Sequence, residues 1–279
     1  MTDNTEHGFA SLPPPAAALG SAFARPKLIA AACIIALTLL GWAALALMSA
    51  GQGDMFAVLC RPSAGALSAA DVSVVALMWT AMVLAMMLPS AAPMILTYAE
   101  IADTAARKGE PVVSPFALAA GYTVIWLGYA ALATILQIAV TRTALLNSGL
   151  AAASGLFAGA IFIAAGVYQF SAFKHACLRQ CQHPFPFFFA NWATTTRGVF
   201  RLGLKQGLFC VGCCWAMMLV MFAVGIMNIV WMAGLAVVMT VEKIGAGRRF
   251  SHAVGAALIL IGLGFVAAGF SAHWPGHAI

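Results

Sequence analysis

Charged residues are scarce in this sequence. Only 8% of its 279 residues are Asp, Glu, Lys or Arg, whereas 63% are hydrophobic and the mean hydropathy is +0.97. A soluble domain typically has about 25% charged residues. The composition therefore excludes an ordinary soluble domain and predicts an all-α, polytopic integral membrane helix bundle in contact with the lipid bilayer. In a membrane protein an excess of Lys and Arg indicates which loops face the cytoplasm. The net charge of +6 therefore does not indicate a nucleic-acid partner.

Several catalytic motifs are also absent. The sequence has no G-x4-G-K-[ST] loop, which excludes nucleotide hydrolysis by that motif, and no H-E-x-x-H or G-x-S-x-G, which excludes common membrane proteases and hydrolases. C-x-x-C-H is missing, which argues against covalent haem. The seven cysteines are clustered and odd in number, unlike a secreted disulfide framework. An enzyme is therefore the less favoured class.

Long apolar runs are what the sequence does have. The 35 residues from 207 to 241 would form a helix of about 52 Å, longer than a hydrocarbon core of about 30 Å, so we expect a break near Gly225. This gives about seven spans in a domain covering 26–272. They lie near 28–48, 72–98, 115–140, 154–173, 207–222, 226–241 and 253–270. Residues 1–25 are predicted to be a disordered cytoplasmic tail, and 273–279 a short outer tail.

The positive charges favour one orientation. With seven spans and a cytoplasmic N-terminus, every Lys and Arg except Arg61 and Arg142 lies on the cytoplasmic side. A six-span arrangement would move Lys243, Arg248 and Arg249 outward as well. Because Lys and Arg are retained in cytoplasmic loops, seven spans in a bacterial inner (plasma) membrane is the better prediction.

Sulfur atoms line one face of the segment GLFCVGCCWAMMLVM. On a helix, five side chains fall within an arc of about 100°: Cys210, Cys213, Cys214, Met217 and Met221. Thiolates and thioethers are soft ligands that suit Cu(I), zinc or iron–sulfur chemistry. The stripe predicts metal or thiol chemistry at the start of the fifth span, although methionines alone would be ordinary core packing.

A second group of possible ligands stands in KHACLRQCQH. Cys177 and Cys181 are four residues apart and share a helix face with Lys174, as a pair of metal ligands would. His175 and His183 point elsewhere while the helix continues, and His183 joins the cysteines only if the helix ends before Pro184. Inert cysteines beside interfacial histidines are the alternative.

The second span combines prolines with methionines. Pro89 and Pro93 lack an amide hydrogen and interrupt the helical hydrogen bonds, as in the broken helices of ion sites. Three methionines follow one another at intervals of four residues: Met78, Met82 and Met86. They form a possible metal pathway with Met217 and Met221, while ordinary kinked packing is the alternative reading.

The predicted topology brings these features to one membrane face. Glu100 ends the second span, Cys181 follows the fourth, Cys210 begins the fifth and Glu242 ends the sixth. A single site near the cytoplasmic face is therefore plausible, with the two glutamates nearby. Whether the helices adjoin is not decided by the sequence.

The sequence resembles a known family at several motifs. MMLPSAAPM, YQFSAFKHACLRQC, GLFCVGCCWAMM and GIMNIVWM resemble DUF2182, a family of bacterial integral membrane proteins described as predicted metal-binding, over about residues 70–245. The resemblance implies that the cysteines of the two Cys-rich segments are the metal ligands: Cys177, Cys181, Cys210, Cys213 and Cys214.

Three functions remain open. The first is binding of copper or zinc for handling, transport or delivery, with a membrane protein or metallochaperone as partner. The second is a membrane oxidoreductase that depends on thiols or a metal. The third is a scaffold subunit of a membrane complex, whose cysteines only pack.

Overall fold

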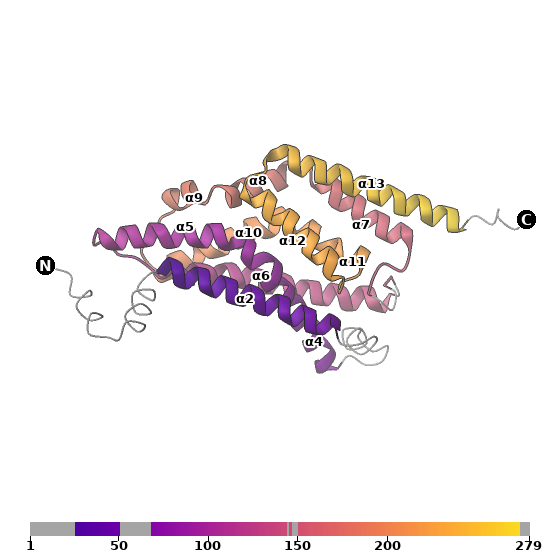
Figure 1. Cartoon of the computed structure of the whole chain (residues 1–279), viewed down its shortest axis with the longest axis horizontal. Helices are drawn as coiled ribbons and strands as arrows, with labels where there is room; N and C mark the ends of the chain where they lie inside the picture. Colours follow the sequence, from indigo (N-terminus) through magenta and orange to yellow (C-terminus); the bar gives the residue numbers. More distant parts are fainter. Residues whose placement is uncertain (1–25, 51–67, 144, 147–149, 274–279) are drawn as a thin grey trace, which may run out of the picture.

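The chain folds as an elongated bundle of helices (Figure 1). The structure is a computed structural model that describes residues 26–50, 68–143, 145–146 and 150–273. No β-strand occurs among these residues, which confirms the predicted all-α, polytopic bundle. The predicted tail 1–25 lies outside the described residues, as does all of 273–279 except His273.

Twelve helical elements follow one another along the described residues. Their bounds are α2 Pro26–Ala50, α4 Ala69–Met82, η1 Val83–Met87, α5 Leu88–Arg107, α6 Pro115–Arg142, α7 Gly155–Tyr168, α8 Ala172–Gln182, α9 Pro184–Ala190, α10 Thr196–Leu219, α11 Met221–Val224, α12 Ile229–Ile244 and α13 Gly247–His273.

Five segments are long and apolar enough to cross a membrane. These are Lys27–Ser49, Ala69–Arg107, Pro115–Arg142, Thr196–Val224 and Gly247–Gly269. α7 and α8, bent by 64°, would make a sixth if they are counted as one broken span. α12 has 16 residues, fewer than the roughly 20 that a span needs, so the count of seven stays a prediction.

The predicted break near Gly225 is confirmed. Gly225 has φ +104°, a left-handed value that favours glycine, and it ends α11. The side chain of Asn228 then accepts a hydrogen bond from the Trp231 amide at 3.2 Å and caps α12. Two local signals, a glycine and a cap, therefore interrupt the apolar run.

α10 begins much earlier than the predicted residue 207. Thr195 caps the helix by accepting a hydrogen bond from Gly198 N at 3.2 Å, and the first turns keep Arg201 and Lys205 exposed. Hydropathy misses these turns because they are amphipathic rather than apolar. Cys210 therefore lies near the middle of the helical segment Thr196–Val224, while its place at the start of the membrane-crossing part stays a prediction.

The fourth predicted span is two helices. α7 ends at Tyr168, and Ser171 starts α8 by accepting a hydrogen bond from Lys174 N at 3.1 Å. The axes of α7 and α8 differ by 64°. The two cysteines predicted to follow the fourth span, Cys177 and Cys181, therefore lie on a separate helix.

Glycines allow two helix pairs to approach closely. Gly121 of α6 faces Gly203 of α10, and a Cβ at either position would collide with the backbone of the other helix. In the same way, Gly159 and Gly262 bring α7 against α13, two helices that lie side by side in Figure 1. Small residues are the usual means of close helix packing in membranes.

The predicted disturbance in the second span is a π-helical turn. η1 forms this turn and ends two residues before Pro89, whereas Pro93 lies inside α5 without ending it. The Met87 carbonyl accepts hydrogen bonds from Tyr122 Oη at 3.2 Å and from Ser90 Oγ at 2.8 Å. Such turns occur frequently at functional sites.

Candidate metal centre

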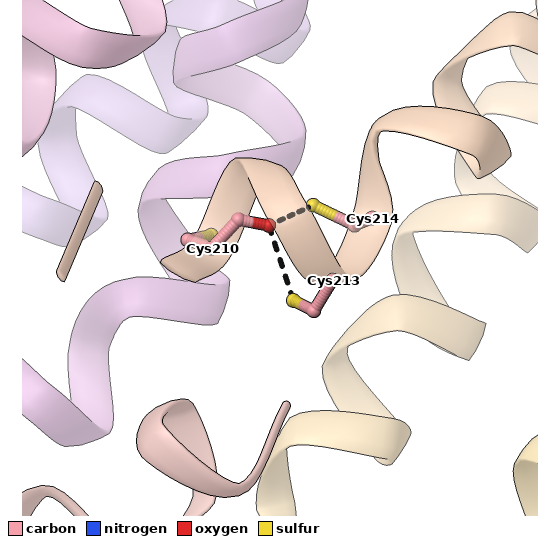
Figure 2. Close-up of side chains that lie close together, drawn as sticks. All are labelled: Cys210, Cys213 and Cys214. Carbon is pink, nitrogen blue, oxygen red and sulfur yellow. Dashed lines mark hydrogen bonds between the residues drawn. The ribbon is translucent and has the colours of Figure 1, made fainter. Parts of the chain in front are cut away.

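Three thiols meet on one turn of α10 (Figure 2). The sulfur atoms of Cys210, Cys213 and Cys214 all lie within 4.8 Å of one another, and each side chain is at most 2% exposed. Cys213 and Cys214 donate hydrogen bonds to the Cys210 carbonyl, at 3.1 and 2.8 Å. The C-x2-C-C spacing therefore gathers three donors without help from another segment.

Cys210 has two polar neighbours from other helices. Lys243 Nζ of α12 donates to its sulfur at 3.0 Å, and Tyr122 Oη of α6 lies 3.0 Å from the same atom. Lys243 also donates to Ser90 Oγ at 2.7 Å. A nearby ammonium stabilises a thiolate, the form in which cysteine binds metals.

Lys243 is a functional candidate that the sequence did not reveal. A lysine at a helix end near the membrane surface is expected to extend toward water. Here it is only 5% exposed and points into the core. Its position next to Glu242 was the only available signal, because two adjacent charged residues interrupt an otherwise apolar helix.

The cysteine segment of α8 adjoins the cysteine segment of α10. The sequence alone did not predict whether these two segments are in contact. α8 packs against α10, and Cys181 of α8 lines the same small cavity as Cys210 of α10. Cys177 lies beside Gly212, where an added Cβ would come within 2.8 Å of the Cys177 sulfur. Glycine at this position therefore makes room for the α8 thiol.

Cys181 and Cys210 line one small cavity. Its volume is about 10 Å³, enough for roughly one water molecule. The lining residues are Ser90, Ala91, Met94, Tyr122, Cys181, Gln206, Cys210 and Lys243. The amide nitrogen of Gln206 is buried there without a hydrogen-bond partner among the described residues. The cavity is thus a polar space beside the thiols.

Methionine sulfur reaches the thiols from an unexpected position. Met87, at the end of η1, has its sulfur 3.8 Å from the Cys214 thiol and is fully buried. We call the five groups Cys181, Cys210, Cys213, Cys214 and Met87 the sulfur site. Met87 was missed because the predicted ladder follows α-helical spacing, and a π-helical turn adds one residue.

The predicted pathway methionines are all in the core. Met78, Met82, Met86, Met217 and Met221 are at most 1% exposed. Met217 accepts a hydrogen bond from Gln169 Nε2 at 2.7 Å, and Trp79 of α4 stacks on Phe222 of α11 with ring centroids 5.6 Å apart. The predicted methionines of α4 and α11 therefore lie on helices in contact.

The two predicted glutamates have other partners. Both carboxylate oxygens of Glu242 accept hydrogen bonds from Lys174 Nζ, at 2.8 and 2.7 Å, in an ion pair whose side chains are 3% and 0% exposed. Glu100 is 65% exposed and pairs with Lys27 at 2.8 Å. Neither carboxylate belongs to the sulfur site.

The two predicted histidines also lie apart from the thiols. The His175 ring contacts His252 of α13, with centroids 5.3 Å apart, and His183 ends α8. Both line a cavity on the opposite face of α8 from Lys174 and Cys177. In the part of the chain that the structure describes, the three α10 thiols are the only close group of three metal-binding side chains.

Comparison with known proteins agrees with this donor chemistry. The family described as PpoB2, copper chaperone, matches residues 76–265, a range that includes every residue of the sulfur site. No curated protein and no solved structure matches the chain. Thiol and thioether donors are the ligands that suit copper in its reduced state. Because the match covers more than half of the 279 residues, the chain belongs to the family described as PpoB2, copper chaperone.

Proposed function

We propose that this protein binds Cu(I) as cargo at the sulfur site, inside the bacterial inner (plasma) membrane, and delivers it to a membrane protein or metallochaperone. The observation that carries the proposal is the meeting of three buried thiols within 4.8 Å of one another. Met87 of η1 contacts the Cys214 thiol, and Cys181 of α8 lines the same small cavity as Cys210. The DUF2182 resemblance, with its metal-binding description, agrees with this role.

The donor set favours copper over zinc. Zinc binds four cysteines alone as well as mixed Cys, His and carboxylate sets, so the thiols by themselves do not distinguish the two metals. Here the imidazoles and carboxylates lie elsewhere, while the thioether of Met87 is 3.8 Å from Cys214. Thioethers select Cu(I), so we expect copper to bind more tightly than zinc.

Lys243 lowers the free-energy cost of a buried thiolate in a medium of low polarity. A charge removed from water requires a partner of opposite sign. The lysine ammonium lies 3.0 Å from Cys210 and supplies that charge before copper binds. We infer that it positions the Cys210 thiolate and is not itself a ligand, since an ammonium has no free electron pair.

Buried methionines provide a route for copper to leave. Weak single ligands permit exchange between neighbouring positions, which a transported ion requires. Met217 lies one helical turn after Cys213, and Met221 follows on the next turn, near α4 with Met78 and Met82. We propose that copper passes along these thioethers, with the small cavity beside Cys181 as the opposite opening.

Thiol oxidoreductase activity is the second function that the cysteines suggested. Exchange between thiols and disulfides requires access of a second thiol to the reacting sulfur. The three α10 cysteines are at most 2% exposed, which favours metal binding over exchange with a large partner. A scaffold without bound metal is the remaining alternative.

Competition for Cu(I) tests the proposal. The protein in mild detergent is titrated with Cu(I) against a coloured chelator, beside Cys213→Ser/Cys214→Ser and the control Cys33→Ser, which removes a thiol of α2. We expect about one high-affinity Cu(I) per chain in wild type and in the control, and loss of that binding in the double variant. Equal binding by the folded double variant would contradict the sulfur site, and no binding in wild type would favour the scaffold.

A further inference from the structure

The outer face of α8 forms a positively charged cavity that the copper site does not use. His175, Arg179 and His183 follow one another at intervals of four residues and therefore share one helix face. Arg248, at the start of α13, closes the cavity from the other side. The cavity has a volume of about 430 Å³, within the range of small-ligand sites, roughly 300–1,000 Å³.

The lining has one sign of charge. Its eight residues are Ala172, His175, Leu178, Arg179, Gln182, His183, Gly247 and Arg248, and none is acidic. Neither arginine has an ion-pair partner among the described residues. The nearby carboxylate of Glu242 is taken by Lys174. The cavity therefore carries uncompensated positive charge, which disfavours a metal cation and favours an anion.

The place of the cavity in the membrane narrows the choice of anion. The candidate span Gly247–Gly269 begins at the cavity, so Arg248 lies where apolar helix gives way to water. Lipid phosphates occupy this level, and basic pockets between membrane helices bind anionic head groups. Two guanidinium groups suit phosphate oxygens because each can donate two parallel hydrogen bonds.

We propose that the cavity between α8 and the start of α13 binds a phosphate group, through Arg179 and Arg248. The phosphate can come from an anionic phospholipid or from free phosphate. The assignment does not depend on the copper proposal.

Binding to Arg179→Gln/Arg248→Gln tests the site. The matched control is Arg249→Gln, which removes the same charge from the adjacent exposed position outside the cavity lining. Affinity is measured in detergent for short-chain phosphatidylglycerol, for phosphatidylcholine and for inorganic phosphate, with sodium chloride at equal ionic strength. Circular dichroism verifies that each variant is folded.

We expect wild type to bind a phosphate-bearing anion, and each arginine removed to weaken that binding about fivefold. Phosphatidylglycerol bound more tightly than inorganic phosphate identifies a lipid site, and the reverse order identifies free phosphate as the ligand. If the double variant keeps wild-type affinity for both, or if Arg249→Gln weakens binding equally, the cavity is not the site.

Discussion

The side-chain ammonium of Lys243 lies 3.0 Å from the sulfur of Cys210, deep inside the bundle. No carboxylate pairs with this lysine among the residues that the structure describes. The Cys210 sulfur, as a thiolate, would therefore balance the charge of Lys243. This contact joins α12 to α10 at the sulfur site.

Lys243→Gln should weaken Cu(I) binding. Glutamine keeps a hydrogen-bond donor near Ser90 but removes the positive charge that stabilises the Cys210 thiolate. Hydrogen bonds to charged groups contribute about 1.5–3 kcal/mol, so we expect a loss of affinity of at least about tenfold by chelator competition. Lys205→Gln, which changes an exposed lysine of α10, is the control. Unchanged affinity in Lys243→Gln would exclude the charge effect.

Met87→Leu tests whether the thioether is a ligand. Leucine fills nearly the same volume, so the fold should be kept at a cost below about 1.5 kcal/mol. We expect Cu(I) affinity to fall by roughly tenfold, as for other changes beside a metal ligand set. Met239→Leu, at another fully buried methionine, is the control and should bind as wild type does. Equal affinities in the two variants would remove Met87 from the site.

Gly212→Ala should separate α8 from α10. The added Cβ would lie 2.8 Å from the Cys177 sulfur, and overpacking of this kind costs about 1–3 kcal/mol. Thermal unfolding in detergent should show a lower Tm, together with weaker copper binding as Cys181 moves away. Gly234→Ala has nothing within 4 Å of the new Cβ and should be neutral or stabilising by up to about 1 kcal/mol. A Gly212→Ala variant with the Tm of wild type would show that Gly212 and Cys177 are not tightly packed.

Lys174→Met should destabilise the fold. It leaves the Glu242 carboxylate buried without its partner, and breaking a buried pair in this way costs about 3–5 kcal/mol. Lys174→Met/Glu242→Met should recover most of that loss, because no charge is then left buried. Lys27→Met breaks an exposed pair and should cost less than about 1 kcal/mol in the same denaturant titration. A double variant as unstable as the single one would contradict this explanation.

Local signals in the sequence were enough to predict much of the fold. Apolar runs predicted an all-α membrane bundle, and the excessive length of the run 207–241 predicted the break near Gly225. The same runs did not predict where α10 begins, since Arg201 and Lys205 belong to an amphipathic helix that hydropathy reads as a loop. Hydropathy measures burial in lipid, whereas helix bounds also depend on caps and on packing between helices.

The site was predictable only within single helices. Helical spacing placed Cys210, Cys213 and Cys214 together, and they do meet. Contacts between helices cannot be predicted from the residue spacing within one segment. The contacts of Lys243 with Cys210 and of Met87 with Cys214 depend on how α12 and η1 pack against α10. The role of Cys177 as a metal ligand and the role of the pathway methionines in transport stay predictions.

The ligands of bound copper test the central claim most directly. Protein loaded with Cu(I) in detergent is measured by X-ray absorption at the copper edge, beside the Cys213→Ser/Cys214→Ser variant. We predict a shell of sulfur atoms alone around Cu(I), and no defined copper site in the variant. Nitrogen or oxygen ligands in wild type, or a sulfur shell that persists in the variant, would contradict binding at the α10 thiols.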